Sequence, residues 1–356
     1  MPGCTSRSRY LVPLQQSRPA GRLLGGTGNP TARGGPGCPA VEQQNMVTMK
    51  LGLSMGGFPM GTEAAGVGPL LSRLARRADE AGFDSLWTMD HFFQIPITGQ
   101  PPEAPLLEAY AVLAFLAAQT ERIRLGTMVT SVAYRHPGVL IKAVTSIDVL
   151  SGGRVIFGLG AGAPFNELPA GRSPRDFEVP GLGIPFPTLA ERFERLEEVV
   201  QIALQMWRGD EAPYEGRHYQ LLRPLNSPNT LQFPHPPVLI AGSGERKTLR
   251  LVARYADMCN LFDLPGTGFA DDLKHKLDVL RSHCDDAARN YSAIEKTVSS
   301  LIDPDEDQAG ILAHLAELAD LGIDHAIVSP RRSWDEATLD WAAAIVSDVH
   351  AIPTGG

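Results

Sequence analysis

Hydrophobic and polar positions follow two periodicities that alternate along residues 49–356. Short apolar runs that stop at glycine or polar residues are typical of buried strands, and apolar residues at helical spacing follow each run. The predicted strands are Lys50–Ser54, Asp84–Met89, Ile123–Thr130, Arg154–Gly160, Val238–Gly242, Met258–Phe262, Lys296–Leu301 and His325–Ser329. Eight strand–helix units favour a (β/α)8 TIM barrel over a doubly wound sheet.

The interval between the fourth and fifth predicted strands, Ala161 to Pro237, is longer than a crossover helix requires. It begins with a Pro- and Gly-rich stretch, 163–187, which we expect to be a loop. An amphipathic helix carrying Phe193 and Trp207 follows, and Tyr214–Leu221 then alternates as a strand does. Long loops at the C-terminal face of a barrel shape its pocket, and we expect this enlarged insertion to do so.

Residues 1–45 are rich in Gly, Pro, Ser and Arg and lack apolar periodicity. We expect a disordered extension there and a barrel domain over 46–356. An acid-poor, arginine-bearing N-terminus is also typical of a transit peptide, but the many Gly and Pro residues break any amphipathic helix. Five arginines against the single acid Glu42 give this extension +4, so the total of −8 leaves −12 for the remainder.

Composition excludes several classes of protein. With 43% hydrophobic and 20% charged residues, the 356-residue chain is typical of a soluble globular protein. A net charge of −8 argues against nucleic acid or an anionic membrane as a partner, and no apolar run approaches the roughly 20 residues of a membrane span. The four scattered cysteines predict reduced thiols in a cytoplasmic protein. No zinc-binding or EF-hand motif is present, so we expect no metal site.

Two groups of polar residues lie just beyond predicted strands, where barrel side chains face the active site. Asp90 and His91 follow the second strand, and an imidazole can transfer protons near neutral pH. The alternative is a structural histidine bonded to Asp90, but the position favours a functional one. Arg135 and His136 follow the third strand; they either bind an anionic substrate or form a solvated loop with His136 at a helix start, and we favour the loop.

The fifth strand ends at Gly242-Ser243-Gly244, immediately before a helical pattern. A strand, a glycine turn and a helix leave backbone N–H groups free to bind a phosphate, and Arg246 and Lys247 add positive charge. An ordinary turn, in which glycine serves only the backbone geometry, remains the alternative. The stretch is not a P-loop, because Arg246 rather than glycine precedes Lys247.

The segment Gly158-Leu-Gly160-Ala-Gly162-Ala163 has a weak similarity to the dinucleotide-binding fingerprint. It runs into Pro164 and a long loop rather than a helix, and no matching ribose-binding acid follows. We therefore expect these glycines to let a flat ring system approach the backbone.

Taken together, the motifs resemble the luciferase-like flavin and deazaflavin oxidoreductases, and most closely their F420-dependent branch. The matching stretches are GFDSLWTMDHFF (82–93), IRLGTMVTSVAYRHPG (123–138), VLSGGRVIFGLGAG (149–162), GIPFPTLAERFERLEEVVQIALQMWRGD (183–210), YEGRHYQL (214–221) and PPVLIAGSGERKTLRLVARYADMCNLF (236–262). They are specific for the superfamily, less so for the cofactor and weakly so for the substrate.

The resemblance implies a TIM barrel with a cofactor ring across its C-terminal mouth, and a homodimer. It assigns His91 to proton transfer beside the ring and implies a non-prolyl cis peptide at Met128–Val129. The implied cofactor contacts come from Asp90, Met128, Val129, Thr130, Gly160, Gly162, Asn166, Gly242, Ser243, Gly244, Glu245 and Arg246. The Glu245 carboxylate opposes a phosphate unless Arg246 and Lys247 offset it or it points away.

The activity that the resemblance implies is hydride transfer between coenzyme F420 and a small organic substrate, reducing a C=C or C=N bond. An FMN-dependent monooxygenase using O2 and a catalytically silent barrel are the alternatives. Sugar-phosphate dehydrogenases of the superfamily carry a glutamate where this chain has Ala163, which argues against glucose-6-phosphate oxidation. Glu108 and Tyr134 are minor candidates for the pocket.

Overall fold

The computed structural model describes residues 47–56, 62–95, 100–162, 174–263 and 269–355. The disordered extension predicted for residues 1–45 lies outside these ranges. The strands are β1 (Lys50–Met55), β2 (Ser85–Thr88), β3 (Arg124–Thr127), β4 (Thr130–Ser131), β5 (Val155–Gly160), β6 (Tyr214–Glu215), β7 (Gln220–Leu221), β8 (Val238–Ala241), β9 (Met258–Asp263), β10 (Glu295–Ile302) and β11 (His325–Pro330).

The main sheet closes on itself as a parallel barrel. Its strands are hydrogen-bonded in the order β3-β2-β1-β11-β10-β9-β8-β5, and β3 pairs with β5 to complete the ring. Each of the eight predicted strands forms one wall of this barrel, so the TIM-barrel prediction is confirmed. Because all strands run the same way, their C-terminal ends share one mouth.

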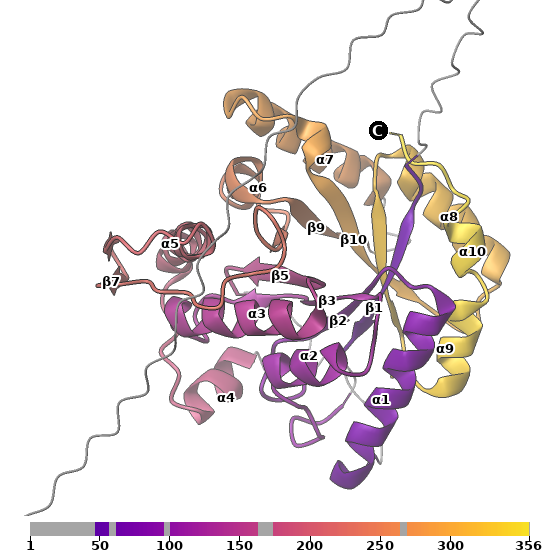
Figure 1. Ribbon diagram of the computed structural model, residues 1–356. Helices are drawn as coiled ribbons and strands as arrows, with labels where there is room; N and C mark the ends of the chain where they lie inside the picture. Colours follow the sequence, from indigo (N-terminus) through magenta and orange to yellow (C-terminus); the bar gives the residue numbers. More distant parts are fainter. Residues whose placement is uncertain (1–46, 57–61, 96–99, 163–173, 264–268, 356) are drawn as a thin grey trace, which may run out of the picture. The chain divides into compact units, whose positions relative to one another are not determined.

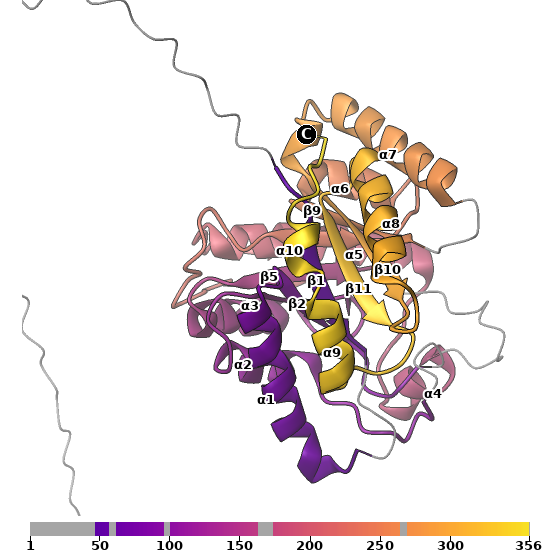
Figure 2. The ribbon, with the colours of Figure 1, turned by 90° about the vertical axis from the view of Figure 1, so that its right-hand side faces the viewer.

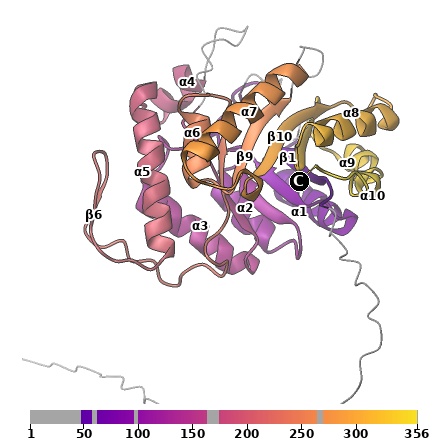
Figure 3. The same ribbon diagram turned by 90° about the horizontal axis from the view of Figure 1, so that it is seen from above.

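Helices surround the barrel in a ring that is seen end-on in Figure 3. The helices are α1 (Ala64–Ala81), α2 (Ala109–Ala117), α3 (Pro137–Ser151), α4 (Pro174–Gly181), α5 (Leu189–Trp207), α6 (Thr248–Tyr255), α7 (Phe269–Asp286), α8 (Gln308–Asp320), α9 (Glu336–Ala343) and α10 (Val346–Val349). On α1, the buried residues Leu71, Leu74 and Ala78 recur at helical spacing and pack into the core between helices and sheet. No described helix is long and apolar enough to cross a membrane.

The third predicted strand is interrupted near its end. The structure divides it into β3 and β4, and the peptide bond between Met128 and Val129, which lies between them, is cis. The sequence pattern predicted one continuous strand, whereas the resemblance implied this cis bond. The interruption presents both side chains at the mouth of the barrel, where they line a cavity.

The barrel interior is filled by a small cluster that is separate from the larger core. Its buried members are Trp87, Ile156, Leu239, Met258 and Ile327, and Met128, Val129 and Ala241 pack above them. Trp87 needs a glycine opposite: a Cβ atom at Gly126 would lie 2.6 Å from the indole ring. The barrel is therefore a packed core with its open space at the mouth.

In the insertion between β5 and β8, the structure differs from two predictions. Helix α4 lies within the stretch predicted to be a loop, and Figures 1 and 2 show it below α5. The stretch Tyr214–Leu221 is a two-stranded antiparallel hairpin, β6–β7, rather than one strand. It reverses at Gly216, whose N–H donates to the Tyr219 carbonyl oxygen at 2.8 Å. The alternation continues on both sides of the turn, which is why the pattern resembled a single strand.

A buried polar network closes the N-terminal end of the barrel. Glu295, at the start of β10, accepts hydrogen bonds from Lys50 Nζ at 2.7 Å and pairs with His325 Nδ1 at 2.9 Å. His325 Nε2 in turn lies 2.9 Å from Ser85 Oγ. Burial alone would raise the pKa of Glu295, but the hydrogen bonds and positive charge of His325 and Lys50 hold it well below its usual value.

Replacing this carboxylate tests how far the network stabilises the barrel. Glu295→Gln should lower the free energy of unfolding at pH 7 by about 3 kcal/mol, because Lys50 and His325 lose their buried counter-charge. The folded-state pKa is depressed, so the contribution is present above the unfolded pKa of about 4.3 and is lost as the pH falls through the folded value. Urea denaturation at pH 7 and pH 3 should show the difference from wild type shrinking in acid.

Glu336→Gln is the matched control. Its carboxylate pairs with Arg73 at 2.6 Å, but both side chains are about half exposed, so the change should cost less than about 1 kcal/mol. Equal effects of the two substitutions would show that the Glu295 network contributes no more than a surface ion pair.

Candidate active site

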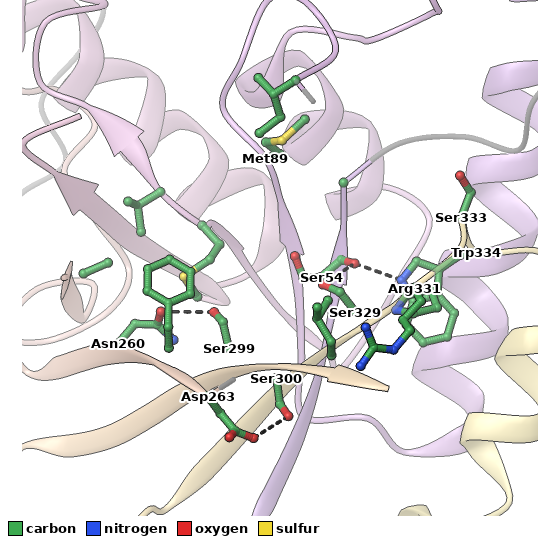
Figure 4. Close-up of a pocket in the computed structure, with 18 of the residues that line it drawn as sticks. Ser54, Met89, Asn260, Asp263, Ser299, Ser300, Ser329, Arg331, Ser333 and Trp334 are labelled. Atoms are coloured by element: carbon green, nitrogen blue, oxygen red, sulfur yellow. Dashed lines mark hydrogen bonds between the residues drawn. The ribbon is translucent and has the colours of Figure 1, made fainter. Parts of the chain in front are cut away.

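A cavity of about 280 Å³ lies at the mouth of the barrel. One side is apolar, with Met128, Val129 and Ala241 over the interior cluster. The polar lining residues belong to β1, β9, β10 and β11 or follow β11 directly, and several of them are labelled in Figure 4. These polar residues are Ser54, Asn260, Asp263, Ser299, Ser300, Ser329, Arg331, Arg332 and Ser333.

His91 lies at the edge of this cavity, just past β2, as predicted. Its Nδ1 atom lies 2.9 Å from Oε2 of Glu178 on α4, and the imidazole is only 15% exposed. The contact joins residues 87 positions apart. Because a hydrogen bond at one ring nitrogen fixes the orientation of the imidazole, Glu178 holds the ring at the cavity edge.

Both carboxylate oxygens of Glu178 have hydrogen-bond partners in the protein. Besides His91, it accepts hydrogen bonds from the backbone N–H groups of Phe92 and Phe93 and, at 3.0 Å, from the Tyr134 hydroxyl. Burial alone would raise the pKa of Glu178, but these hydrogen bonds and the charge of His91 hold it below its usual value. Burial and the neighbouring carboxylate raise the pKa of Tyr134, so this phenol stays a donor. The cluster is a preorganised support for His91.

Asp90 does not bond to His91. Its buried carboxylate receives both terminal nitrogens of Arg135, at 2.6 and 2.9 Å, and Arg135 also binds Glu108. The Arg135 guanidinium lies 4.7 Å from the centroid of the Tyr110 ring, so its planar face is covered as well. The predicted solvated loop is thus wrong for Arg135, whose side chain is only 16% exposed and is held by these partners.

His136 lies at the start of α3, as predicted, where its Nδ1 accepts a hydrogen bond from the N–H of Gly138. The Glu108 carboxylate caps α2 in a similar way, since its Oε2 accepts a hydrogen bond from the N–H of Ala111 at 2.7 Å. Neither Glu108 nor Tyr134 lines the cavity; Tyr134 reaches it only through its contact with Glu178.

The predicted cofactor residues of β4 and β5 lie behind the apolar side of the cavity. The Thr130 hydroxyl lies 2.7 Å from the Tyr110 hydroxyl and is fully buried. A Cβ atom at Gly160 would lie 2.8 Å from Val129 Cγ2, so the protein itself requires a glycine there. Gly162 has a φ of 79°, in the left-handed region. Ala163 and Asn166 lie outside the described residues.

The glycine turn between β8 and α6 has the predicted geometry. Gly242 has a φ of 123°, a conformation that side-chain-bearing residues rarely adopt. Among the described residues, no acceptor takes a hydrogen bond from the backbone N–H groups of Ser243, Gly244 or Glu245. These donors stand at the N-terminal end of α6, where the helix dipole favours an anion.

Glu245 points away from the turn toward α7. Its carboxylate accepts a hydrogen bond from Lys276 Nζ at 2.5 Å and lies 3.2 Å from His275 Nε2. Arg246 is exposed beside the turn, whereas the Lys247 ammonium lies over the Phe193 ring. The conflict between Glu245 and a phosphate is therefore removed by its partners on α7, and Lys247 is directed elsewhere.

One functional candidate, Glu178, was absent from the sequence interpretation. Glu178 carries no local signal, because only the tertiary fold brings α4 to β2. Within the described ranges, no group of three or more His, Cys, Asp or Glu residues could hold a metal ion.

Comparison with known proteins identifies the family. The family model for luciferase-like monooxygenases matches residues 53–344, which is most of the chain. The chain belongs to the luciferase-like monooxygenase family. The resemblance seen in the sequence is confirmed.

Among relatives of this luciferase-like protein, an F420-dependent glucose-6-phosphate dehydrogenase of Kineococcus radiotolerans is 30% identical over 258 residues, covering 71% of this chain and 69% of the relative. An F420-dependent secondary alcohol dehydrogenase, solved with an F420–acetone adduct, matches with a TM-score of 0.69 and 17% identity, over 85% of this chain and 99% of that one. Monooxygenase RslO1 from Streptomyces bottropensis matches with a TM-score of 0.65 and 20% identity, over 84% and 99%. At these identities, the two solved structures establish the fold.

The support around His91 can be tested by hydrogen exchange. Glu178→Ala should speed amide exchange at Phe92 and Phe93, whose N–H groups donate to this carboxylate, by about tenfold. Exchange mass spectrometry on a peptide spanning 90–94 measures the effect, and Glu191→Ala, which removes a partly exposed carboxylate from α5, is the control. Unchanged protection in the Glu178 variant would mean that α4 does not hold this segment.

Proposed function

We propose that the protein is an F420-dependent oxidoreductase that transfers hydride between the deazaflavin C5 and a small organic substrate. The observation that carries this proposal is that His91, Met128 and Val129 line one cavity at the mouth of the barrel. The relatives named as F420-dependent enzymes support the choice of cofactor. The reaction we infer is reduction of a polarised C=C or C=N bond, and Ala163 argues against glucose-6-phosphate as the substrate.

The residues at the mouth suit this cofactor. Met128, Val129 and Ala241 offer an apolar surface for one face of a flat ring. The unpaired N–H groups of Ser243 and Gly244 would hold a phosphate at the start of α6. When bound, a deazaflavin supplies two-electron hydride chemistry.

In the proposed reaction, the protein itself supplies the group that transfers a proton. Glu178 binds Nδ1 of His91 and orients the ring, and we infer that this imidazole, at the edge of the cavity, exchanges a proton with the substrate. Because Tyr134 and two backbone N–H groups fix Glu178, the imidazole is oriented before any ligand binds. We infer that the serine residues that line the cavity contact the substrate.

Cofactor retention tests the proposal most directly. Protein loaded separately with F420 and with FMN, desalted and then denatured, should release F420 and little FMN. Tight retention of FMN without F420 would instead favour the monooxygenase, and retention of neither would favour a catalytically silent barrel.

The glycine turn gives a second test, which separates phosphate binding from ring binding. Ser243→Asp places a negative charge beside the phosphate and should raise the Kd for F420 about tenfold, while Ser243→Asn, a neutral match of similar shape, should change it little. The dephosphorylated deazaflavin should bind both variants as it binds wild type. Fluorescence titration measures the Kd of each ligand for wild type and for both variants. An equal loss of affinity for both ligands would show that the turn does not bind the phosphate.

His91→Ala should lower hydride transfer about a hundredfold or more, yet leave the Kd for F420 within about twofold. Single-turnover absorbance measurements separate the two effects. Wild-type turnover in this variant would contradict the role of His91 in proton transfer.

A further inference from the structure

Arg331 extends the inward face of β11 beyond the end of the strand. Ile327 belongs to the interior cluster of the barrel, and Ser329, the next residue on the same face, lines the cavity. Arg331 follows at the same spacing, and its backbone N–H donates to the Ile302 carbonyl oxygen at 3.0 Å, which continues the pairing of β10 with β11. The alternation therefore places the Arg331 side chain on the cavity side of the sheet, where it is labelled in Figure 4.

The backbone that carries this arginine is anchored at both ends. Arg331 is held to β10 by the hydrogen bond just described. Trp334 is only 2% exposed, and its Nε1 donates to the Ser54 carbonyl oxygen at 2.9 Å, a contact drawn in Figure 4. Asp335 then caps α9 by accepting a hydrogen bond from the N–H of Thr338 at 2.7 Å. Residues 331–334 thus present Arg331 from an ordered segment at the mouth of the barrel.

The Arg331 guanidinium is not committed to a protein carboxylate. Its ion-pair partner among the described residues is Asp303, whose Oδ2 lies 3.7 Å from Nε, too far for a hydrogen bond. Asp303 also accepts a hydrogen bond from the N–H of Asp305 at 3.1 Å through its other oxygen. The Arg331 side chain is 52% exposed. Its N–H donors are therefore available to a ligand in the cavity.

The charges around the cavity favour an anionic ligand. Of the described residues that line it, Asp263 is the one acid, and its carboxylate is bound by Ser300 and His314 on the side of the sheet that faces the helices. Arg331 and Arg332 also line the cavity, so this region is positive in a chain with a net charge of −8. A planar guanidinium can bind both oxygens of a carboxylate. One inward guanidinium balances the single charge of a carboxylate better than the charge of about −2 on a phosphate ester.

We propose that Arg331 is a specificity-determining residue that binds a carboxylate group of the substrate. The proposal rests on the proposed function and narrows its substrate class to small carboxylates. The carboxylate end of the substrate lies at β11, and the apolar surface of Met128, Val129 and Ala241 is left for the cofactor ring. The acidic side chain of the cofactor is a second source of the same chemistry, and the test distinguishes the two.

Binding of matched probes tests this inference without turnover. The probes are benzoate, its neutral analogue benzamide, and phenyl phosphate, with each Kd measured by ligand-observed NMR at neutral pH and low salt, with and without F420. Wild type should bind benzoate about tenfold more tightly than benzamide, because a charge-assisted hydrogen bond replaces a neutral one. Arg331→Gln should reduce this preference to less than about twofold. Arg331→Lys, which keeps the charge without the planar fork, should retain a preference of about threefold.

Arg223→Gln is the control for the overall charge of the protein. It removes the same charge from a side chain that is 67% exposed, pairs with Glu211 at 2.6 Å and does not line the cavity. The preference for benzoate should therefore equal that of wild type. An equal loss in the Arg223 and Arg331 variants would show that the preference comes from net charge, and would overturn the proposal.

A titration with cofactor separates the two sources of a carboxylate. Arg331→Gln should leave the Kd for F420 within about twofold of wild type. A loss of F420 affinity that is absent for the deazaflavin without its acidic side chain would assign Arg331 to the cofactor and overturn the proposal.

The wild-type protein can also contradict the inference. No preference for benzoate over benzamide, or tighter binding of phenyl phosphate than of benzoate, would overturn it, as would an undiminished preference in Arg331→Gln. Because the probes are also measured without cofactor, failure of the proposed F420 chemistry is recognised separately, by the cofactor-retention experiment.

Discussion

The packing of Trp87 inside the barrel is the constraint on which the rest of the structure depends. The indole fills the interior only because Gly126, on the neighbouring strand, has no side chain. Together with Ile156, Leu239, Met258 and Ile327 it makes the barrel solid, and Met128, Val129 and Ala241 rest on this filling. Within the barrel, as far as the described residues show it, space for a ligand therefore lies above them, at the C-terminal mouth. The interior packing, rather than any single polar residue, determines the depth at which a cofactor ring can lie.

The insertion after β5 adds a second constraint at that mouth. Long insertions on a barrel usually shape the entrance, and here α4 also orients a candidate catalytic group, since Glu178 bonds to His91 and to the backbone that follows it. Changes in the insertion that alter substrate entry would therefore also alter the support of His91. The insertion and the orientation of His91 are thus linked through one short helix.

The sequence predicted the fold well and the site partly, for physical reasons. Buried strands and amphipathic helices have short periods that neighbouring residues display, so all eight barrel strands could be located. The strand-end rule likewise placed His91 at the cavity. Contacts between distant segments leave no such pattern: nothing near Glu178 indicates that it meets His91, and nothing near Asp90 indicates that Arg135 saturates it. The helix α4 was missed because proline and glycine flank it closely, although tertiary contacts hold it.

The two buried carboxylates near the mouth both act from behind its wall. Glu178 receives donors on both oxygens from the protein, so it has no capacity left for a ligand and can only orient His91. Asp263 pairs in register with Ser300, on the face of the sheet that packs against the helices, and its carboxylate is bound there by Ser300 and by His314 of α8. Of the two, only Glu178 acts on a group at the cavity edge, and it does so through the imidazole that it orients. A change at Asp263 would therefore reach the cavity through the packing of β9 and β10, whereas a change at Glu178 would reach it through the position of one side chain.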